Sequence, residues 1–215
     1  SPLLFQLSEQ ASSAYLRIRG LSESAAQGNL NPGPDSWLTS ERYRYYRAST
    51  EYRLLAPLAT LKLLQQRLTQ LDMSLDPEIQ LIYTLARQAG SVISDDFQLA
   101  RDASLELTYK PHNQKPEEAE SLKVSNPAIY WQQGVPRGIL DNAVETLLVK
   151  DIEESRRVMS FLEFEEARKQ VGSVKYQALE RIDYLFANFH PRERPVLWRV
   201  LLVTASIYRS ICMIA

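Results

Sequence analysis

Cysteine and histidine are almost absent from this sequence, which narrows the chemistry that it can support. Cys212 is the single cysteine, so the chain cannot form an internal disulfide or a metal site of several thiolates. The two histidines, His112 and His190, have no second histidine or cysteine at the spacing of metal ligands. We therefore expect no metal, no cofactor and a reducing compartment, the cytoplasm.

Glycine is also scarce, at 7 of 215 residues, and the glycine patterns of common enzymes are missing. The sequence has neither a GxGxxG nor a GK[ST] phosphate-binding loop, and it has no GxSxG nucleophile elbow. It also lacks the Glu-x-x-His pair that a ferritin-like di-iron bundle requires. These absences favour a non-catalytic protein, but they do not exclude an enzyme with an unfamiliar site.

Neither an excess of charge nor a long apolar run indicates a polyanionic or membrane partner. The formal net charge is −1, whereas proteins that bind duplex DNA or anionic membranes usually carry a strong basic excess. The most apolar segment, 195–215, is interrupted by Arg199 and Arg209, and a membrane span needs about 20 apolar residues. The amino-terminal residues 1–5 lack the basic start of a signal peptide. We expect no DNA binding, no membrane span and no signal peptide.

Helix-forming patterns are abundant. Between residues 39 and 71, leucines recur at intervals of three and four residues, which is the spacing of a helix face buried against other helices. Pro57 lies inside this pattern and is expected to kink or split the helix. The leucines are Leu54, Leu58, Leu61, Leu64, Leu68 and Leu71.

Helix-capping residues punctuate the rest of the chain. Asp76, followed by Pro77, is a strong helix start, and Ser160 with Glu163 matches a capping box. Glycines are expected to end helices. The helix ends predicted in this way are Gly20, Gly90 and Gly172. Further helices are predicted to start at Ser94 and Ser173. An amphipathic helix is predicted over 139–150, with Asp141 as its cap.

These signals predict an all-α fold, a compact multi-helix bundle of about eight helices around the segments 54–71 and 196–212. One long irregular loop is expected at about 108–138. We treat residues 1–215 as a single helical domain, which this loop could divide weakly into helical halves at 1–107 and 139–215.

The distribution of charge predicts which helices are neighbours. Basic residues predominate in 39–70 and acidic residues in 72–106. Because a short turn places consecutive helices side by side, these two segments are expected to pack antiparallel and to neutralise one another.

Two clusters of basic residues are candidate anion-binding sites. The segment 40–53 mixes arginine and tyrosine, which can hold phosphate, carboxylate or RNA. An alternative for this segment is a solvated helix face with Arg47 and Glu51 paired one turn apart. The second cluster is a proline-bracketed turn at 190–195. The anion-binding candidates are Arg42, Arg47, Arg53, His190, Arg192 and Arg194.

Three functions are consistent with these patterns. The first is a non-catalytic helical module that binds a protein partner or a second copy of itself, with Tyr130, Trp131 and Arg137 as interaction candidates. The second is an enzyme or binding protein for an anionic small molecule, with the arginine-tyrosine helix and the His190 turn as two walls of one pocket. The third is RNA binding by the same helix.

Overall fold

Helices account for about 80% of the residues that the structure describes. In the computed structural model these are residues 2–30, 38, 40–68, 76–94, 135–151, 155–183 and 195–214. Within them lie seven α-helices, one 3-10 helix (Glu41–Tyr43) and a two-stranded sheet. The all-α prediction is therefore confirmed, with slightly fewer helices in this part of the chain than the eight expected.

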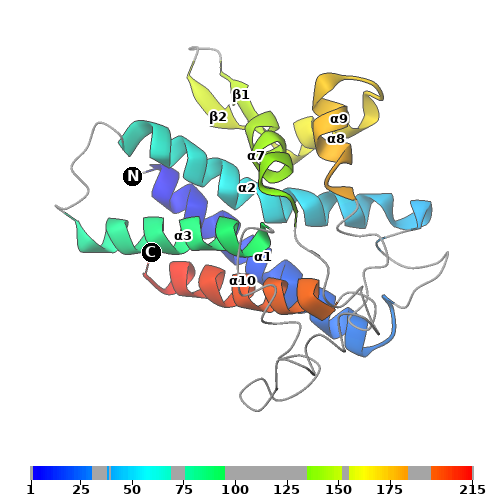
Figure 1. The fold of residues 1–215 in the computed structure, drawn as a ribbon, viewed down its shortest axis with the longest axis horizontal. Coiled ribbons are helices and arrows are strands. Elements are labelled where there is room, and N and C mark those ends of the chain that lie inside the picture. The colour runs from blue at the N-terminus through cyan, green and yellow to red at the C-terminus, as the bar shows by residue number, and fades with distance from the viewer. Residues whose placement is uncertain are drawn as a thin grey trace, which may run out of the picture.

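Four long helices form a bundle in which sequence neighbours lie side by side. They are α1 (Pro2–Ala26), α2 (Arg44–Leu68), α3 (Pro77–Ile93) and α10 (Pro195–Ile214). α1 packs against α2 and α10, and α3 packs against the same two helices from the other side. α1 and α3 run in one direction, and α2 and α10 run in the other (Figure 1). The predicted antiparallel packing of the basic and acidic segments is confirmed for α2 and α3.

The core of the bundle is formed by the leucine face of α2 and the apolar faces of its neighbours. The helical spacing of leucines that predicts a buried face on α2 is confirmed for Leu54, Leu58, Leu61 and Leu64. Both segments expected to organise the bundle, in α2 and α10, do contribute to this core. Its largest fully buried side chains in the four helices are Tyr208, Leu7, Ile18 and Leu21.

α2 continues without a break through Pro57, so the helix is not split there. Proline removes one backbone hydrogen bond, but the residues around it are held by tertiary packing. Leu54 to Leu61 are all buried, and the Thr60 hydroxyl donates a hydrogen bond of 2.6 Å to the Gln10 side chain of α1. Burial on both sides of the proline offsets the lost backbone bond.

Two predicted helix ends are wrong. α1 passes through Gly20 and ends near Gly28, whose φ of 81° suits a C-terminal cap. α3 passes through Gly90 to Ile93. In both helices the apolar face continues beyond the glycine, with Leu21 and Ile93 buried, so packing extends the helix past the residue of low propensity.

The start signals were read correctly where the side chain itself caps the helix. The Asp76 carboxylate accepts hydrogen bonds from the backbone N–H groups of Glu78 and Ile79, at 3.0 and 3.2 Å. The capping box of Ser160 and Glu163 is present, with both of its reciprocal hydrogen bonds. Ser173 also caps a helix, as predicted.

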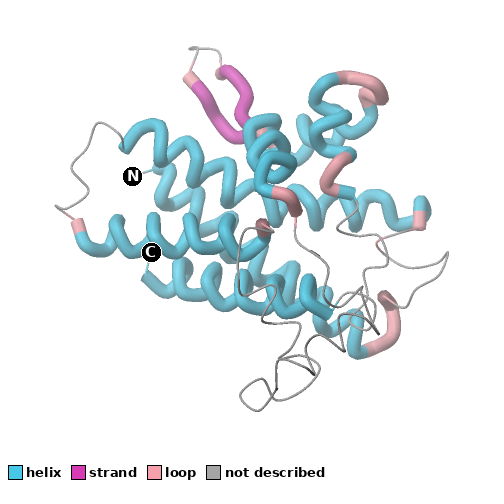
Figure 2. Tube along the Cα trace, in the orientation of Figure 1, coloured by secondary structure: helices cyan, strands magenta, loops and turns pink. Residues whose placement is uncertain are grey.

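A smaller layer of short elements packs on the outside of α2. It comprises α7 (Arg137–Thr146), β1 (Leu148–Lys150), β2 (Arg156–Val158), α8 (Phe161–Lys169) and α9 (Val174–Glu180). β1 and β2 form an antiparallel hairpin, drawn in magenta in Figure 2. In this layer, α7, β2 and α8 contact α2 directly.

The hairpin corrects the predicted helix over 139–150. The helix stops at Thr146, and Leu148 pairs with Val158 across the hairpin. Both of these side chains are buried, and the Met159 N–H donates a hydrogen bond of 2.8 Å to the Leu147 carbonyl. A strand paired to a partner ten residues away cannot be seen in helical periodicity alone. The helix begins earlier than expected, so Pro136, not Asp141, occupies the cap position.

The expected loop at 108–138 is only partly within the described residues. Positions 108–134 lie outside them, as does the rest of the helix predicted after Ser94. Ser94 itself ends α3, and Val135 forms a parallel bridge with it. The division into two halves stays a prediction. In the part of the chain that the structure describes, no helix is long and apolar enough to cross a membrane.

Candidate functional site

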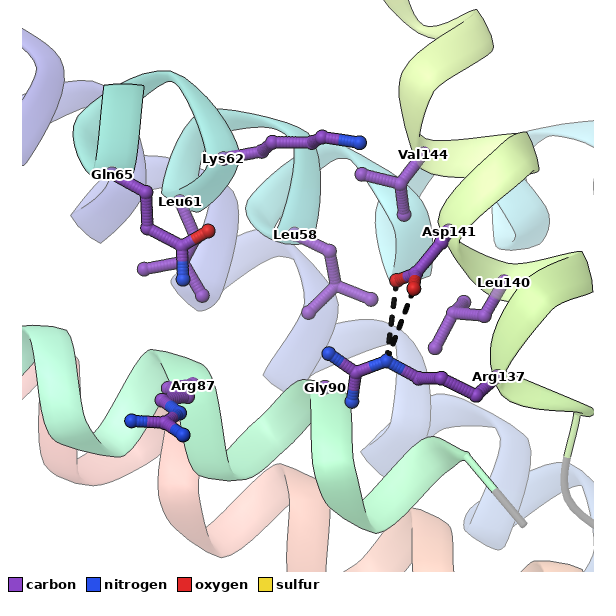
Figure 3. Close-up of a pocket in the computed structure, with 10 residues that line it drawn as sticks. All are labelled: Leu58, Leu61, Lys62, Gln65, Arg87, Gly90, Arg137, Leu140, Asp141 and Val144. Carbon is purple, nitrogen blue, oxygen red and sulfur yellow. Dashed lines mark hydrogen bonds and ion pairs between the residues drawn. The ribbon is translucent and has the colours of Figure 1, made fainter. Parts of the chain in front are cut away.

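A groove lies between α2 and α3, closed at one end by α7. Its cavity volume is about 260 Å³. We call it the α2–α3 groove. Figure 3 shows its lining residues, which come from all three helices: Leu58, Leu61, Lys62, Gln65, Arg87, Gly90, Arg137, Leu140, Asp141 and Val144.

The floor of the groove is apolar. Leu58 and Leu61 of α2 and Leu140 and Val144 of α7 are all buried. Each pair is spaced by three or four residues, so each pair projects from one face of its helix. Gly90 on α3 keeps the groove open, because it has no side chain to fill the space beside Leu58.

The rim of the groove is basic. Lys62 and Arg137 each have an acidic neighbour, since Lys62 lies 2.7 Å from Glu145 and Arg137 lies 3.2 Å from Asp141. In Figure 3 the Arg137 guanidinium extends from α7 toward Gly90, beneath Asp141. Arg87 is exposed on α3, and the described part of the chain gives its side chain no hydrogen-bond or ion-pair partner.

Glu145 organises one edge of this rim. Its carboxylate accepts hydrogen bonds from Lys62 of α2 and Arg156 of β2. These two cations, Lys62 first, lower the pKa of Glu145 below its usual value. The carboxylate therefore stays ionised and holds the Lys62 ammonium at the edge of the groove.

A second cavity, of about 240 Å³, lies where the start of α2 meets α8 and α9. We call it the Arg168 cavity. Three arginines contribute to its wall, Arg44 and Arg47 from α2 and Arg168 from α8. The other lining residues are Glu41, Ala48, Val171, Tyr176 and Asp183.

Beneath this cavity Glu51 is almost completely buried, with 1% of its side chain exposed. Its carboxylate lies 3.4 Å from Arg168 and 3.9 Å from Arg47. Arg168 also pairs with Asp183, at 2.5 Å. Burial raises the pKa of Glu51 well above its usual value, and the positive charge of Arg168 opposes this rise.

The anion-binding candidates of the segment 40–53 have different surroundings in the structure. Arg47 pairs with Glu51 as expected, but Glu51 is buried against Arg168 of α8 and Arg47 is only 22% exposed, so the pair is not on a fully solvated face. Arg42 is exposed, 5.5 Å from the centre of the Tyr43 ring. Arg53 lies near Arg17 of α1, and burial, followed by the positive charge of Arg53, lowers the pKa of the Arg17 guanidinium. The four arginines of this segment therefore do not form a single site.

A third hollow, of about 570 Å³, lies at the end of the bundle where α1, α3 and α10 meet. Its walls combine apolar side chains such as Phe5 and Ile82 with acidic ones. One of these acids, Asp76, already caps α3. The others are Glu9 and Glu78.

Several predicted site residues lie outside the described residues. These are Tyr130, Trp131, His190, Arg192 and Arg194, together with His112. The pocket expected between the arginine-tyrosine helix and the His190 turn therefore stays a prediction. Among the described residues no cluster of three or more histidine, cysteine or acidic side chains has a geometry that could hold a metal ion.

The residues that sequence reasoning missed are those brought in by other elements. Arg137 is one of the predicted interaction candidates, but its groove partners Lys62 and Arg87 belong to two other helices. Arg168 lay in one predicted helix and Asp183 in the next, with no motif around either residue. Only their contact with Glu51 distinguishes them from other surface charges.

Comparison with protein-family models, with curated proteins and with solved structures finds no match for this chain. Any function has to be argued from the groove and the cavity themselves.

Proposed function

We propose that this chain is a non-catalytic protein-interaction module, and that its α2–α3 groove binds an acidic, partly apolar segment of a partner protein. The observation that carries the proposal is the combination of an apolar floor with a basic rim. The floor is formed by Leu58, Leu61, Leu140 and Val144, and the rim by Lys62, Arg87 and Arg137.

The size of the groove favours a partner's side chain over a drug-sized molecule. Sites for drug-sized ligands usually have volumes of roughly 300 to 1,000 Å³ and enclose most of the ligand. The groove, at about 260 Å³, is below that range and is open along its length. One leucine or phenylalanine of a partner segment would fill its floor, and the rest of the segment would remain on the rim.

The charges of the rim favour an acidic segment. Arg87 has no counter-ion among the described residues, and Arg137 pairs with the exposed Asp141. An aspartate or glutamate next to the apolar anchor would be attracted by the positive charge of these guanidinium groups. Charge-assisted hydrogen bonds between a carboxylate and a guanidinium group are stronger than neutral ones and also fix the orientation of the segment.

A random peptide library tests the proposal without knowledge of the partner. Peptides displayed on phage are selected on the full-length chain and counter-selected on the double variant Arg87→Glu, Arg137→Glu. We expect the enriched peptides to share an acidic residue beside a leucine or an aromatic residue. Reversing two charges should weaken binding of a synthetic peptide by a factor of ten or more, since each unlike pair becomes a like pair.

Arg19→Glu is the matched control. Arg19 is also an exposed helical arginine paired with an acid one turn away, Glu23 at 3.5 Å, but it does not line the groove. Binding should be unchanged in this variant. If the selected peptides lack acidic residues, or if all variants bind them equally, the proposal is wrong. If the natural partner is a second copy of the chain, the particle mass measured by light scattering will rise with concentration for the wild type. It will not rise for the double variant Arg87→Glu, Arg137→Glu.

The two other functions remain separate proposals. Binding of an anionic small molecule is considered below for the Arg168 cavity, which contains one of the predicted residues, Arg47. RNA binding through Arg42 and Arg53 would need a surface on which both side chains are accessible. It predicts binding of single-stranded RNA that weakens steeply between about 50 and 200 mM salt.

A further inference from the structure

Behind the wall of the Arg168 cavity lie hydrogen-bond donors that the protein leaves unsatisfied. Two buried nitrogens, Nε of Arg47 and Nη1 of Arg168, make no hydrogen bond. The Arg168 side chain is only 9% exposed, so bulk water cannot solvate it freely. Buried donors normally have partners, and leaving one without a partner is costly.

Both donors belong to side chains that are held in place. Glu51 lies between them, 3.9 Å from Arg47 and 3.4 Å from Arg168, and Asp183 pairs with Arg168 at 2.5 Å. These contacts use Nη2 of Arg168 and leave Nη1 unused. The two guanidinium groups are thus fixed before any ligand arrives, which lowers the entropic cost of binding one.

The charge of the cavity wall suits an anion. Arg44, Arg47 and Arg168 carry three positive charges, and Glu41 and Asp183 carry two negative ones. Glu51 beneath the wall would balance the remaining charge if it were ionised. However, its burial favours the neutral carboxyl and raises its pKa.

We propose that the Arg168 cavity is a binding site for a small organic anion, whose carboxylate or phosphate group accepts hydrogen bonds from Arg47 and Arg168. Guanidinium groups match the geometry of both oxyanions. Arg44 at the mouth adds a third positive charge, and Val171, Ala48 and the Tyr176 ring provide wall for the carbon part of the ligand. This site is separate from the α2–α3 groove and does not depend on the function proposed for it.

The test uses nuclear magnetic resonance of the arginine Nε–Hε groups in the full-length chain. Sodium phosphate and sodium acetate are titrated separately, with the ionic strength held constant by sodium chloride. The Arg47 signal should shift and saturate with at least one of the two anions, because the anion binds beside its guanidinium group. Saturation by phosphate alone, or by acetate alone, identifies which oxyanion the site prefers.

Substitutions in α2 show whether the cavity holds the anion. Arg47→Gln should weaken binding by about tenfold or more, because it removes one of the two charged donors. Arg44→Gln should weaken it less, since this side chain is half exposed at the mouth. Arg42→Gln is the control, because Arg42 is an exposed arginine of the same segment that does not line the cavity.

Removal of Arg168 is avoided in the first round, because Glu51 and Asp183 would then lack their shared cation. Arg168→Lys retains the charge and loses the planar group, so it should fold and bind more weakly. Thermal unfolding of each variant verifies the fold. The proposal is overturned if the Arg47 signal does not saturate below about 20 mM of either anion, a weakness beyond that of a typical metabolite site. Equal affinities of Arg42→Gln and Arg47→Gln would overturn it as well.

Discussion

Arg157 and Glu163 form a bidentate ion pair, in which two guanidinium nitrogens lie 2.8 and 2.7 Å from the two carboxylate oxygens. The same carboxylate also accepts a hydrogen bond from the Ser160 backbone N–H at the start of α8. The pair joins β2 to α8, and so connects the hairpin to the helix that covers the Arg168 cavity. Hydrogen bonds from Arg157, and then from Ser160, lower the pKa of Glu163 to about 2.

This lowered pKa predicts a loss of stability in acid. A carboxyl with a depressed pKa stabilises the fold above its unfolded pKa, near 4.5, and the contribution disappears as the pH falls through about 2. The side chain is 40% exposed, so solvent screening keeps the effect to about 1 kcal/mol. Glu163→Gln should destabilise the protein in urea at pH 7 and make no difference near pH 2.

Glu166→Gln is the control for that comparison. Glu166 also forms an ion pair on α8, with Lys169 at 2.9 Å, but both partners are 55% exposed and it caps nothing. Its substitution should change the free energy of unfolding by less than about 0.5 kcal/mol. Equal effects of the two substitutions at pH 7 would show that the capping box contributes nothing.

For Glu51 we expect the stability of the fold to depend on pH in the opposite direction. Its folded pKa is raised above the usual 4.5, so the folded state holds a proton that the unfolded state has lost. The stabilisation linked to this proton is complete below about pH 4.5 and is lost as the pH rises through the folded pKa. The groups that face this carboxyl are Arg47, Arg168 and Asp183, and the arginines limit the shift.

Glu51→Gln imitates the protonated carboxyl at every pH. Its stability relative to the wild type should therefore improve as the pH is raised from 5 to 8.5, as measured by urea unfolding at each pH. If the difference in unfolding free energy between Glu51→Gln and the wild type stays constant over this pH range, Glu51 is ionised throughout and is balanced by Arg168.

Two glycines offer a clean test of backbone conformation. Neither Gly20 nor Gly172 has any atom within 4 Å of an added Cβ, so alanine causes no clash at either position. Gly20 lies inside α1, where alanine should stabilise the protein by roughly 0.5 to 1 kcal/mol. Gly172 has a φ of +85°, where alanine is strained and should cost about 1 kcal/mol. Shifts of equal sign in the melting temperature would contradict this assignment.

Truncation of buried leucines in α2 and α10 should destabilise the protein strongly. Leu61 of α2 is 6% exposed and Leu201 of α10 is 3% exposed. Alanine at either position should destabilise the protein by about 2 to 5 kcal/mol, through lost burial and the cavity left behind. Leu202, at 46% exposure, is the adjacent control and should cost less than about 1 kcal/mol. Losses below about 1 kcal/mol at both buried positions would mean that the helix faces are assigned wrongly.

Local sequence signals predicted structure correctly where the interacting groups are close together along the chain. The caps of Asp76, Ser160 and Ser173 were predicted because a short polar side chain reaches backbone donors two or three residues away. The buried face of α2 was predicted because helical periodicity alone places its leucines on one side. The all-α class follows from the same two kinds of signal.

Features that depend on contacts between distant segments of the chain could not be predicted from local sequence signals. α1 and α3 pass through Gly20 and Gly90 because burial of the following residues outweighs the low helix propensity of glycine, about 1 kcal/mol. The strand at Leu148 exists because its partner strand returns beside it. Arg47 and Glu51 are four residues apart, so helical geometry alone places them close enough to pair. Only the packing of α8 made Glu51 a buried acid, since it excluded water and brought Arg168 to the same carboxylate.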